Sequence, residues 1–213
     1  MSKTRIKICG ITNLDDALYA IDCGADALGF VFYDKSPRFI DTLKAKQIIN
    51  QLPPFVSCCG LFVNAAPQTI QAGIDANISL IQFHGDETAT ECEQFNFPYI
   101  RAIRAKDAST LINAQNAYSK ARGLLIDSYN PNLYGGSGQT FDWSIIPSDM
   151  RQKIILAGGL TAENVQSAIA IVKPYAVDVS GGVESQKGIK CRQKIKAFCD
   201  AVHSVNTISD IHD

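Results

Sequence analysis

The sequence has no apolar run that approaches the roughly 20 residues of a membrane-spanning helix. It also has no cluster of lysines or arginines, and its formal net charge is only −1. Binding to nucleic acid or to a membrane surface needs a concentrated basic face, so we expect neither partner. Residues 1–5 lead directly into a short apolar strand, without the apolar core of a signal peptide. We therefore expect a cytoplasmic protein.

Cysteine pairs with metal-binding or redox spacing are missing as well. The chain has seven cysteines, an odd number, and none of them forms a C-x-x-C pair. Cys58 and Cys59 are adjacent, so in a strand they point to opposite faces and cannot easily bind one ion. We expect six of the seven to be reduced, buried and small hydrophobic residues, and we predict no metal site. Cys9 is treated separately below.

What the sequence does have is enough apolar material for one large globular domain. Of its 213 residues, 46% are hydrophobic and 19% are charged, which is typical of a folded protein with a substantial core. A single α/β barrel commonly occupies about 200–250 residues. Because no linker or low-complexity tract interrupts the chain, we expect residues 1–213 to form one domain. Residues 204–213 are polar, and we expect them to form a frayed tail.

Short β-rich apolar runs alternate with longer segments of helical periodicity. The predicted strands span residues 5–9, 27–32, 55–62, 79–83, 99–103, 123–127, 153–157 and 176–179. The predicted helices span residues 14–23, 43–51, 67–76, 88–95, 108–118, 164–172 and 189–202. This alternation is typical of a parallel sheet with crossover helices, and eight repeats in about 200 residues favour a closed (β/α)8 barrel.

The sixth repeat lacks a clear helix. Residues 128–138 form a long glycine-rich stretch, and only a short helical turn at 143–146 fits before the seventh strand. In a barrel of this kind, the loops that follow the strands line the catalytic face. The long loop is therefore predicted to be a lid or a binding loop.

Two strand ends carry candidate proton-transfer groups. Lys7 and Cys9 lie two residues apart on the first strand and therefore share a face. A lysine ammonium and a helix N-terminus would both favour a Cys9 thiolate, which could act as a base; the alternative is an ordinary buried cysteine. Asp127 closes the apolar sixth strand and is either a general acid or base, or a cap of the next loop.

Other strand ends offer binding groups. Arg38 follows the second strand and suits a carboxylate, because a guanidinium binds one in a bidentate fork; it could equally be a surface arginine. Gln82 and His84 end the fourth strand, and we expect them to line the binding site rather than to catalyse. The Asp86–Glu87 pair after them is expected at a helix N-terminus, where carboxylates complement the helix dipole.

Glycine pairs follow the seventh and eighth strands. Gly158 and Gly159 follow the seventh, while Gly181 and Gly182 follow Ser180 after the eighth. Loops in these two positions often form the phosphate site of a barrel, because bare backbone N–H groups there point at the anion. The alternative is plain turn glycine, but two pairs in successive positions favour phosphate binding.

These motifs together resemble the phosphoribosylanthranilate isomerase family. The resemblance runs in order through KICGIT at 7–12, SPR at 36–38, LFVN at 61–64, QFHGDE at 82–87, GGSGQTFDW at 135–143, LAGGLTAENV at 156–165 and VDVSGGVE at 177–184. The first and fifth of these are highly specific, whereas the phosphate glycines are common to many phosphosugar barrels. The resemblance implies a TIM barrel of the ribulose-phosphate-binding type.

The resemblance also implies a reaction and roles for residues. The reaction is the Amadori rearrangement of N-(5-phosphoribosyl)anthranilate in tryptophan biosynthesis, with Cys9 as general base, Asp127 as general acid and Arg38 near the anthranilate carboxylate. The expected substrate-binding residues include Lys7 and Asp178. No step transfers a hydride or an electron, so no cofactor is expected. The partner is a small phosphosugar, and the chain is expected to be a monomer or a homodimer.

Some positions depart from the family pattern. Ala162 and Gly181 stand where proline and serine are common, and backbone-mediated phosphate binding should tolerate both. Lys187 and Cys191 replace a frequent proline and aspartate, which puts any family role of the Gly188 loop in question.

Three other functions compete with this assignment. Another phosphosugar barrel, such as an indole-glycerol phosphate synthase, would favour a catalytic lysine with a partner glutamate, and beyond Lys7 the strand ends show no such pair. A non-catalytic phosphate binder would have no reason to retain both Cys9 and Asp127. A purely structural barrel explains the glycine pairs least well.

Overall fold

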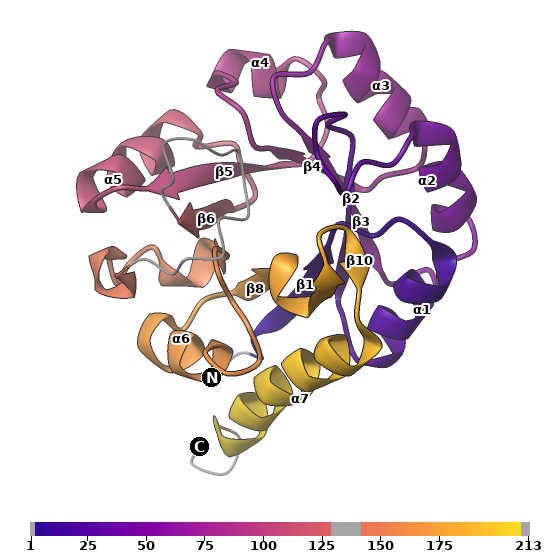
Figure 1. Ribbon diagram of the computed structural model, residues 1–213. Helices are drawn as coiled ribbons and strands as arrows, with labels where there is room; N and C mark the ends of the chain where they lie inside the picture. The colour runs from indigo at the N-terminus through magenta and orange to yellow at the C-terminus, as the bar shows by residue number, and fades with distance from the viewer. Residues whose placement is uncertain (1–2, 129–141, 210–213) are drawn as a thin grey trace.

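Eight parallel strands close into a barrel in the order of the chain (Figure 1). The computed structural model describes residues 3–128 and 142–209. The strands are β1 (Arg5–Cys9), β2 (Ala27–Val31), β3 (Ser57–Phe62), β4 (Leu80–Phe83), β5 (Tyr99–Ala105), β6 (Leu124–Ser128), β7 (Ile154–Leu156) and β8 (Ala176–Val179). Strand β1 pairs in parallel with both β2 and β8, and this pairing closes the barrel. The predicted (β/α)8 barrel is confirmed.

Helices surround the barrel on its outside (Figure 1). They are α1 (Leu14–Asp22), α2 (Thr42–Ile49), α3 (Pro67–Asp75), α4 (Ala89–Glu93), α5 (Ala108–Ala117), α6 (Val165–Val172) and α7 (Arg192–Ser209). Between β6 and β7 the described residues contain only the 3-10 turns η1 (Trp143–Ile145) and η2 (Arg151–Lys153). The short turn predicted at 143–146 is therefore confirmed. Most of the predicted lid, from residue 129 to its end at 138, lies outside the described residues.

Polar side chains fix where several helices begin. Asn13, Asp41 and Asp107 each accept a hydrogen bond from a backbone N–H in the first turn of α1, α2 and α5. Thr88 and Glu91 form a capping box at the start of α4. Such caps satisfy N–H groups that the helix itself leaves without a partner, typically stabilising it by about 1 kcal/mol.

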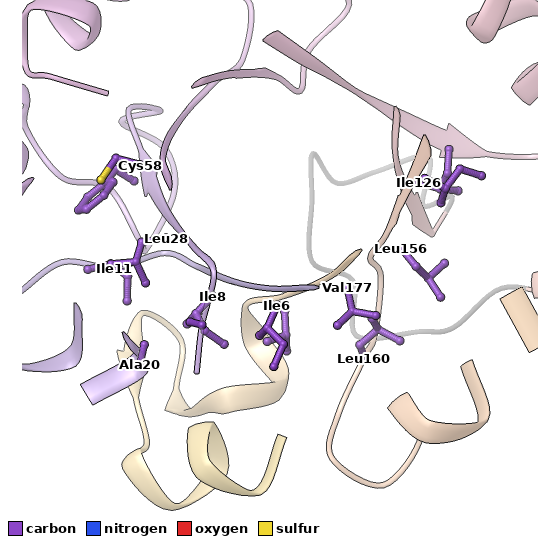
Figure 2. Packing of buried hydrophobic residues seen from close by; sticks show 14 of the residues in the cluster. Ile6, Ile8, Ile11, Ala20, Leu28, Cys58, Ile126, Leu156, Leu160 and Val177 are labelled. Atoms are coloured by element: carbon purple, nitrogen blue, oxygen red, sulfur yellow. The ribbon is translucent and has the colours of Figure 1, made fainter. Parts of the chain in front are cut away.

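Strand residues alternate between two apolar clusters. Ile6, Ile8 and Ile126 belong to the larger cluster, which packs between the barrel and the helices. Figure 2 shows Ile6 and Ile8 of β1 and Val177 of β8 pointing away from the barrel centre. The smaller cluster fills the interior with residues of alternate strand positions: Cys59, Ile100, Ala102, Leu125, Ile155, Ala157 and Ala176. The intervening residues of β1, Lys7 and Cys9, therefore share the interior face, as predicted.

The boundaries of several predicted elements are wrong, among them those of β3 and the last helix. Strand β3 begins at Ser57 rather than at 55, because the chain turns at residues 54–55 and leaves the Phe55 side chain 99% exposed. The last helix begins at Arg192 and not at Ile189, and it continues to Ser209. Residues 204–209, predicted to be a frayed tail, are helical. No helix in these described ranges is long and apolar enough to cross a membrane.

A small hairpin precedes the last helix. After β8 the chain forms the 3-10 turn η3 (Gly181–Val183), then strands β9 (Glu184–Gln186) and β10 (Ile189–Lys190), which pair antiparallel. Gly188 at its turn has φ +84°, and a Cβ there would lie 2.3 Å from the backbone oxygen of Pro37. The hairpin therefore packs closely on the loop that follows β2. Sequence periodicity assigned part of this hairpin to helix because its strands are only three and two residues long.

All seven cysteines are free thiols. Five of them are buried, but Cys23 and Cys191 are only half-buried. The expectation of six buried structural cysteines is therefore wrong for these two. Cys58 and Cys59 belong to different apolar clusters, which confirms that they point to opposite faces of β3.

Candidate active site

A buried ion pair lies inside the barrel beside Cys9. The Lys7 Nζ donates to Asp178 Oδ1 at 2.7 Å, and the two residues are register partners on β1 and β8. Burial is the largest influence and alone would lower the pKa of Lys7, but the charge and hydrogen bond of Asp178, together with the neighbouring Cys9 and Cys59, raise the pKa above its ordinary value. Lys7 is therefore a permanent ammonium with a fixed carboxylate partner.

Cys9 is a protonated thiol in the free protein. Burial raises the pKa of Cys9 above its ordinary value, and the neighbouring charges of Lys7 and Lys190 only partly oppose that rise. Burial therefore opposes the predicted thiolate in this state, since the thiol is only 4% exposed and Asp178 offsets part of the Lys7 charge. Gly29 makes room for the sulfur, since a Cβ there would lie 2.7 Å from Cys9 Sγ.

Asp127 lies close to the imidazole of His84 at the barrel mouth. Asp127 Oδ2 lies 3.4 Å from His84 Nε2, and both side chains are buried. The Gln82 amide nitrogen lies 2.9 Å from His84 Nδ1, while the Cys59 thiol lies 3.9 Å from Gln82 Oε1. If the thiol and the amide donate in these contacts, His84 carries its proton on Nε2 and presents it to Asp127.

Two loops, hereafter the glycine loops (residues 157–161 and 180–183), follow β7 and β8. Gly158 and Gly159 both have positive φ, +82° and +66°, a conformation that glycine adopts without strain. The loops touch, since a Cβ on Gly182 would lie 2.0 Å from the backbone oxygen of Leu160. Within the described residues, no protein acceptor is found for the backbone N–H of Gly159, Gly181 or Gly182. These donors can therefore bind an anion.

Arg38 already has a carboxylate partner within the chain. Its Nε and Nη2 donate to the two oxygens of Glu184 at 2.7 and 2.8 Å. Lys190 Nζ donates to Glu184 Oε1 at 3.0 Å and to the backbone oxygen of Ser180 at 3.1 Å. Burial alone would raise the pKa of Glu184, but Arg38 and Lys190 together hold it below its ordinary value. Arg38 is thus not an ordinary surface arginine.

The sequence model of the N-(5′-phosphoribosyl)anthranilate (PRA) isomerase family matches residues 6–201 of the chain. The chain belongs to this family. The family resemblance, the isomerase class and the link to tryptophan biosynthesis expected from the sequence are confirmed.

Curated members of the PRA isomerase family are close in sequence. The enzyme of Pseudomonas fluorescens strain Pf0-1 is 55% identical over 203 residues, which cover 95% of this chain and 100% of the relative. The enzyme of Pseudomonas syringae pv. tomato is 54% identical over 204 residues, covering 95% and 99%.

Solved PRA isomerases share the fold. The Thermotoga maritima crystal structure has a TM-score of 0.87 and 40% identity, covering 94% of this chain and 99% of that one. A second PRA isomerase structure, with TM-score 0.83, 39% identity and the same coverage, holds reduced 1-(o-carboxyphenylamino)-1-deoxyribulose 5-phosphate.

The structure brings together most residues that the sequence singled out, and it adds some that were missed. Gly29, Glu184 and Lys190 contact candidate site residues, but none of them carries a strand-end pattern of its own. Glu87 does not serve a helix N-terminus as expected. It is buried and accepts from the backbone N–H of Asn64 and Gly85 at 2.7 and 2.9 Å. Among the described residues, no group of three or more His, Cys, Asp or Glu side chains is placed to hold a metal ion.

Gly182 is the position where a small substitution should damage the glycine loops most. In Gly182→Ala the new Cβ would meet the Leu160 backbone oxygen and push the loops apart, and misplacing a site by about 1 Å can cost roughly a hundredfold. We expect the KM for a phosphorylated substrate and the Kd for inorganic phosphate to rise together. Gly181→Ala is the comparison, because its Cβ meets only Arg38 Nη2, at 3.5 Å. Equal effects of the two substitutions would contradict this account.

Proposed function

We propose that this chain converts N-(5-phosphoribosyl)anthranilate to 1-(2-carboxyphenylamino)-1-deoxyribulose 5-phosphate, with Asp127 as general acid and Cys9 as general base. The observation that carries the proposal is the placement of these two buried groups. They end β6 and β1, which are separated by two strands on one side of the barrel and four on the other. Each can therefore reach a different part of one bound sugar.

The first step opens the ribose ring. Asp127 gives its proton to the ring oxygen, the C1–O bond breaks, and the anthranilate nitrogen lone pair forms a C1=N iminium. Asp127 becomes a carboxylate as this happens, and the His84 Nε2 at 3.4 Å is placed to stabilise the new negative charge.

The second step removes the hydrogen at C2. The Cys9 thiolate takes the proton, the C2–H electron pair becomes a C1=C2 bond, and the nitrogen regains its lone pair. The enolamine then gives the ketone: the Cys9 thiol gives its proton to C1, and the Asp127 carboxylate takes the C2 hydroxyl proton, which restores both groups. The iminium formed beside Cys9 is a cation, and a nearby positive charge favours the thiolate that this step needs.

The rest of the site supports recognition of the substrate's two ends. The N–H groups of Gly158, Gly159, Gly181 and Gly182, together with Ser180, are assigned to the phosphate. Arg38 is assigned to the anthranilate carboxylate. The buried side chains of Lys7, Asp178 and Gln82 line the interior beneath the sugar and are assigned to its hydroxyl groups.

Loss of the fluorescence of N-(5-phosphoribosyl)anthranilate on addition of purified protein tests this function. We expect catalytic amounts of the chain to abolish the fluorescence and to yield the ketose. A protein that binds the substrate and leaves its fluorescence unchanged would refute the proposal.

The raised pKa of Cys9 predicts a pH dependence. The free enzyme favours Cys9 as the thiol, so the rate of its alkylation should increase with pH by up to about tenfold per unit below the Cys9 pKa. The check is the rate at which iodoacetamide inactivates the enzyme from neutral to alkaline pH, with Cys9→Ser as the control for the other thiols. A rate that is flat, or that falls over this range, would show that Cys9 is already ionised in the free enzyme.

Location and assembly complete the proposal. Seven free thiols favour a reducing compartment, and we place the enzyme in the cytoplasm. We propose one domain for the whole chain and a monomer or homodimer. A related structure is of monomers derived from a dimeric Thermotoga maritima isomerase.

A further inference from the structure

The Arg38 guanidinium has two edges in its plane, hereafter its two faces, and each can bind a carboxylate through two N–H groups. One face combines Nε with Nη2, and Glu184 occupies it through bonds of 2.7 and 2.8 Å. The other face combines the outer N–H groups of Nη1 and Nη2, for which no acceptor is found in the described part of the chain. A carboxylate ligand can therefore bind Arg38 without displacing Glu184.

The side-chain charges around Glu184 would be balanced by one more anion. Arg38 and Lys190 both donate to this one carboxylate, so the cluster of three side chains carries one excess positive charge. Glu184 and Lys190 are 6% and 8% exposed, so solvent screens that charge poorly. One substrate carboxylate would neutralise it.

The cluster is held rigidly. A Cβ on Gly10 would lie 2.7 Å from Arg38 Cδ, so the arginine stem packs directly on the loop that follows β1. Lys194 Nζ donates to the backbone oxygen of Glu184 at 2.8 Å, which ties β9 to helix α7. A positioned guanidinium loses less freedom when it binds a ligand than a mobile one.

Lys190 links this cluster to the loop after β8. Its Nζ donates to the backbone oxygen of Ser180 at 3.1 Å as well as to Glu184. Because the C=O and N–H of one peptide point in opposite directions, holding the Ser180 carbonyl toward Lys190 directs the Gly181 N–H away from it. The lysine thereby fixes one of the donors assigned to the phosphate.

We propose that Glu184 is a positioning residue for substrate specificity: it holds Arg38 so that the outer face of the guanidinium receives the aromatic carboxylate, and Lys190 couples this end of the site to the phosphate loop. This inference rests on the proposed function and extends it to residues that touch no reacting atom.

The test compares two ligands. One is the ketose product, and the other is the same compound with hydrogen in place of the aromatic carboxylate. We expect the wild-type chain to bind the first about tenfold or more tightly than the second, as a charge-assisted bidentate contact allows. In Glu184→Gln most of this selectivity should disappear, KM should rise more than kcat falls, and the Kd for inorganic phosphate should stay unchanged.

Three further variants make the result specific. Lys196→Met removes a cation of the same helix, α7, whose partner is the exposed Asp200, and it should retain wild-type selectivity. Lys190→Met should weaken binding of both the carboxylated product and inorganic phosphate. In an Arg38→Met background, Glu184→Gln should have no further effect on selectivity, because Glu184 acts through Arg38. If Glu184→Gln does not fold, Glu184→Asp keeps the charge but withdraws it by one methylene, and it should also lose selectivity.

Three outcomes would overturn the inference while leaving the proposed function intact. If every Glu184 variant that folds binds the two ligands with wild-type selectivity, Arg38 needs no positioning by Glu184. Tighter binding of the carboxylated product by Glu184→Gln would show that Glu184 competes with the ligand. A wild-type chain that converts the substrate but binds both ligands equally would also overturn it. A wild-type chain that converts no substrate would instead refute the proposed function, and this inference with it.

Discussion

Cys9→Ser is expected to lower turnover by about a hundredfold to ten-thousandfold, the usual contribution of a general base. Serine is nearly isosteric, so it should fit the space beside Gly29, and ligand binding should change little. Its hydroxyl, however, is far too weak an acid to ionise beside the iminium, so no base would be present to accept the C2 hydrogen. The check is kcat at saturating substrate together with the Kd of the product.

Cys58→Ser is the matched control for this substitution. Cys58 is also buried and lies on β3, but it faces the outer apolar cluster and not the site. We expect it to reduce stability and to leave turnover near the wild-type value. If Cys9→Ser kept most of its turnover, the base would have to be another group.

Asp127→Asn is expected to lower turnover by a similar factor of about 10² to 10⁴, because the amide cannot give a proton to the ring oxygen. The amide has nearly the shape of the carboxylic acid, so its oxygen can keep its place 3.4 Å from His84 Nε2. The KM should therefore change little while kcat falls, as expected for an interaction made in the transition state.

Asp107→Asn controls for the chemical change itself. Asp107 is exposed and caps helix α5, and asparagine is an equally good cap. Its turnover should match the wild type. Retention of most turnover by Asp127→Asn would remove Asp127 from the proposed ring-opening step.

The barrel and much of the candidate site could be predicted because both follow from local patterns. Alternation along β1 placed Lys7 and Cys9 on one face, and the structure has them on the interior side. In a parallel barrel the strand ends meet at one mouth, so Asp127 and the glycine loops could be assigned to the same site without knowing any distance.

The state of Cys9 could not be predicted, because it depends on burial inside the closed barrel and on a contact made across 171 positions of sequence. Burial penalises the anion most, and Asp178 on β8 offsets part of the charge of Lys7, which alone would favour a thiolate. Sequence shows which charges exist, and only the fold shows which of them are already paired.

The partner of Arg38 was hidden for a related reason. Glu184 lies 146 positions away, in a hairpin too short to show any periodicity. The departures at Lys187 and Cys191 flank the hairpin turn at Gly188, which packs closely on Pro37. This hairpin therefore docks on the loop after β2 with lysine and cysteine at these two positions.

One measurement tests most directly that Asp127 is the acid and Cys9 the base. It uses substrate deuterated at C2, with single-turnover fluorescence decay as the readout. In Cys9→Ser the removal of the C2 hydrogen is the slow step, so deuterium should slow the residual reaction. In Asp127→Asn ring opening is the slow step, so deuterium should have no effect. A deuterium effect in Asp127→Asn but not in Cys9→Ser would contradict the assignment of acid and base.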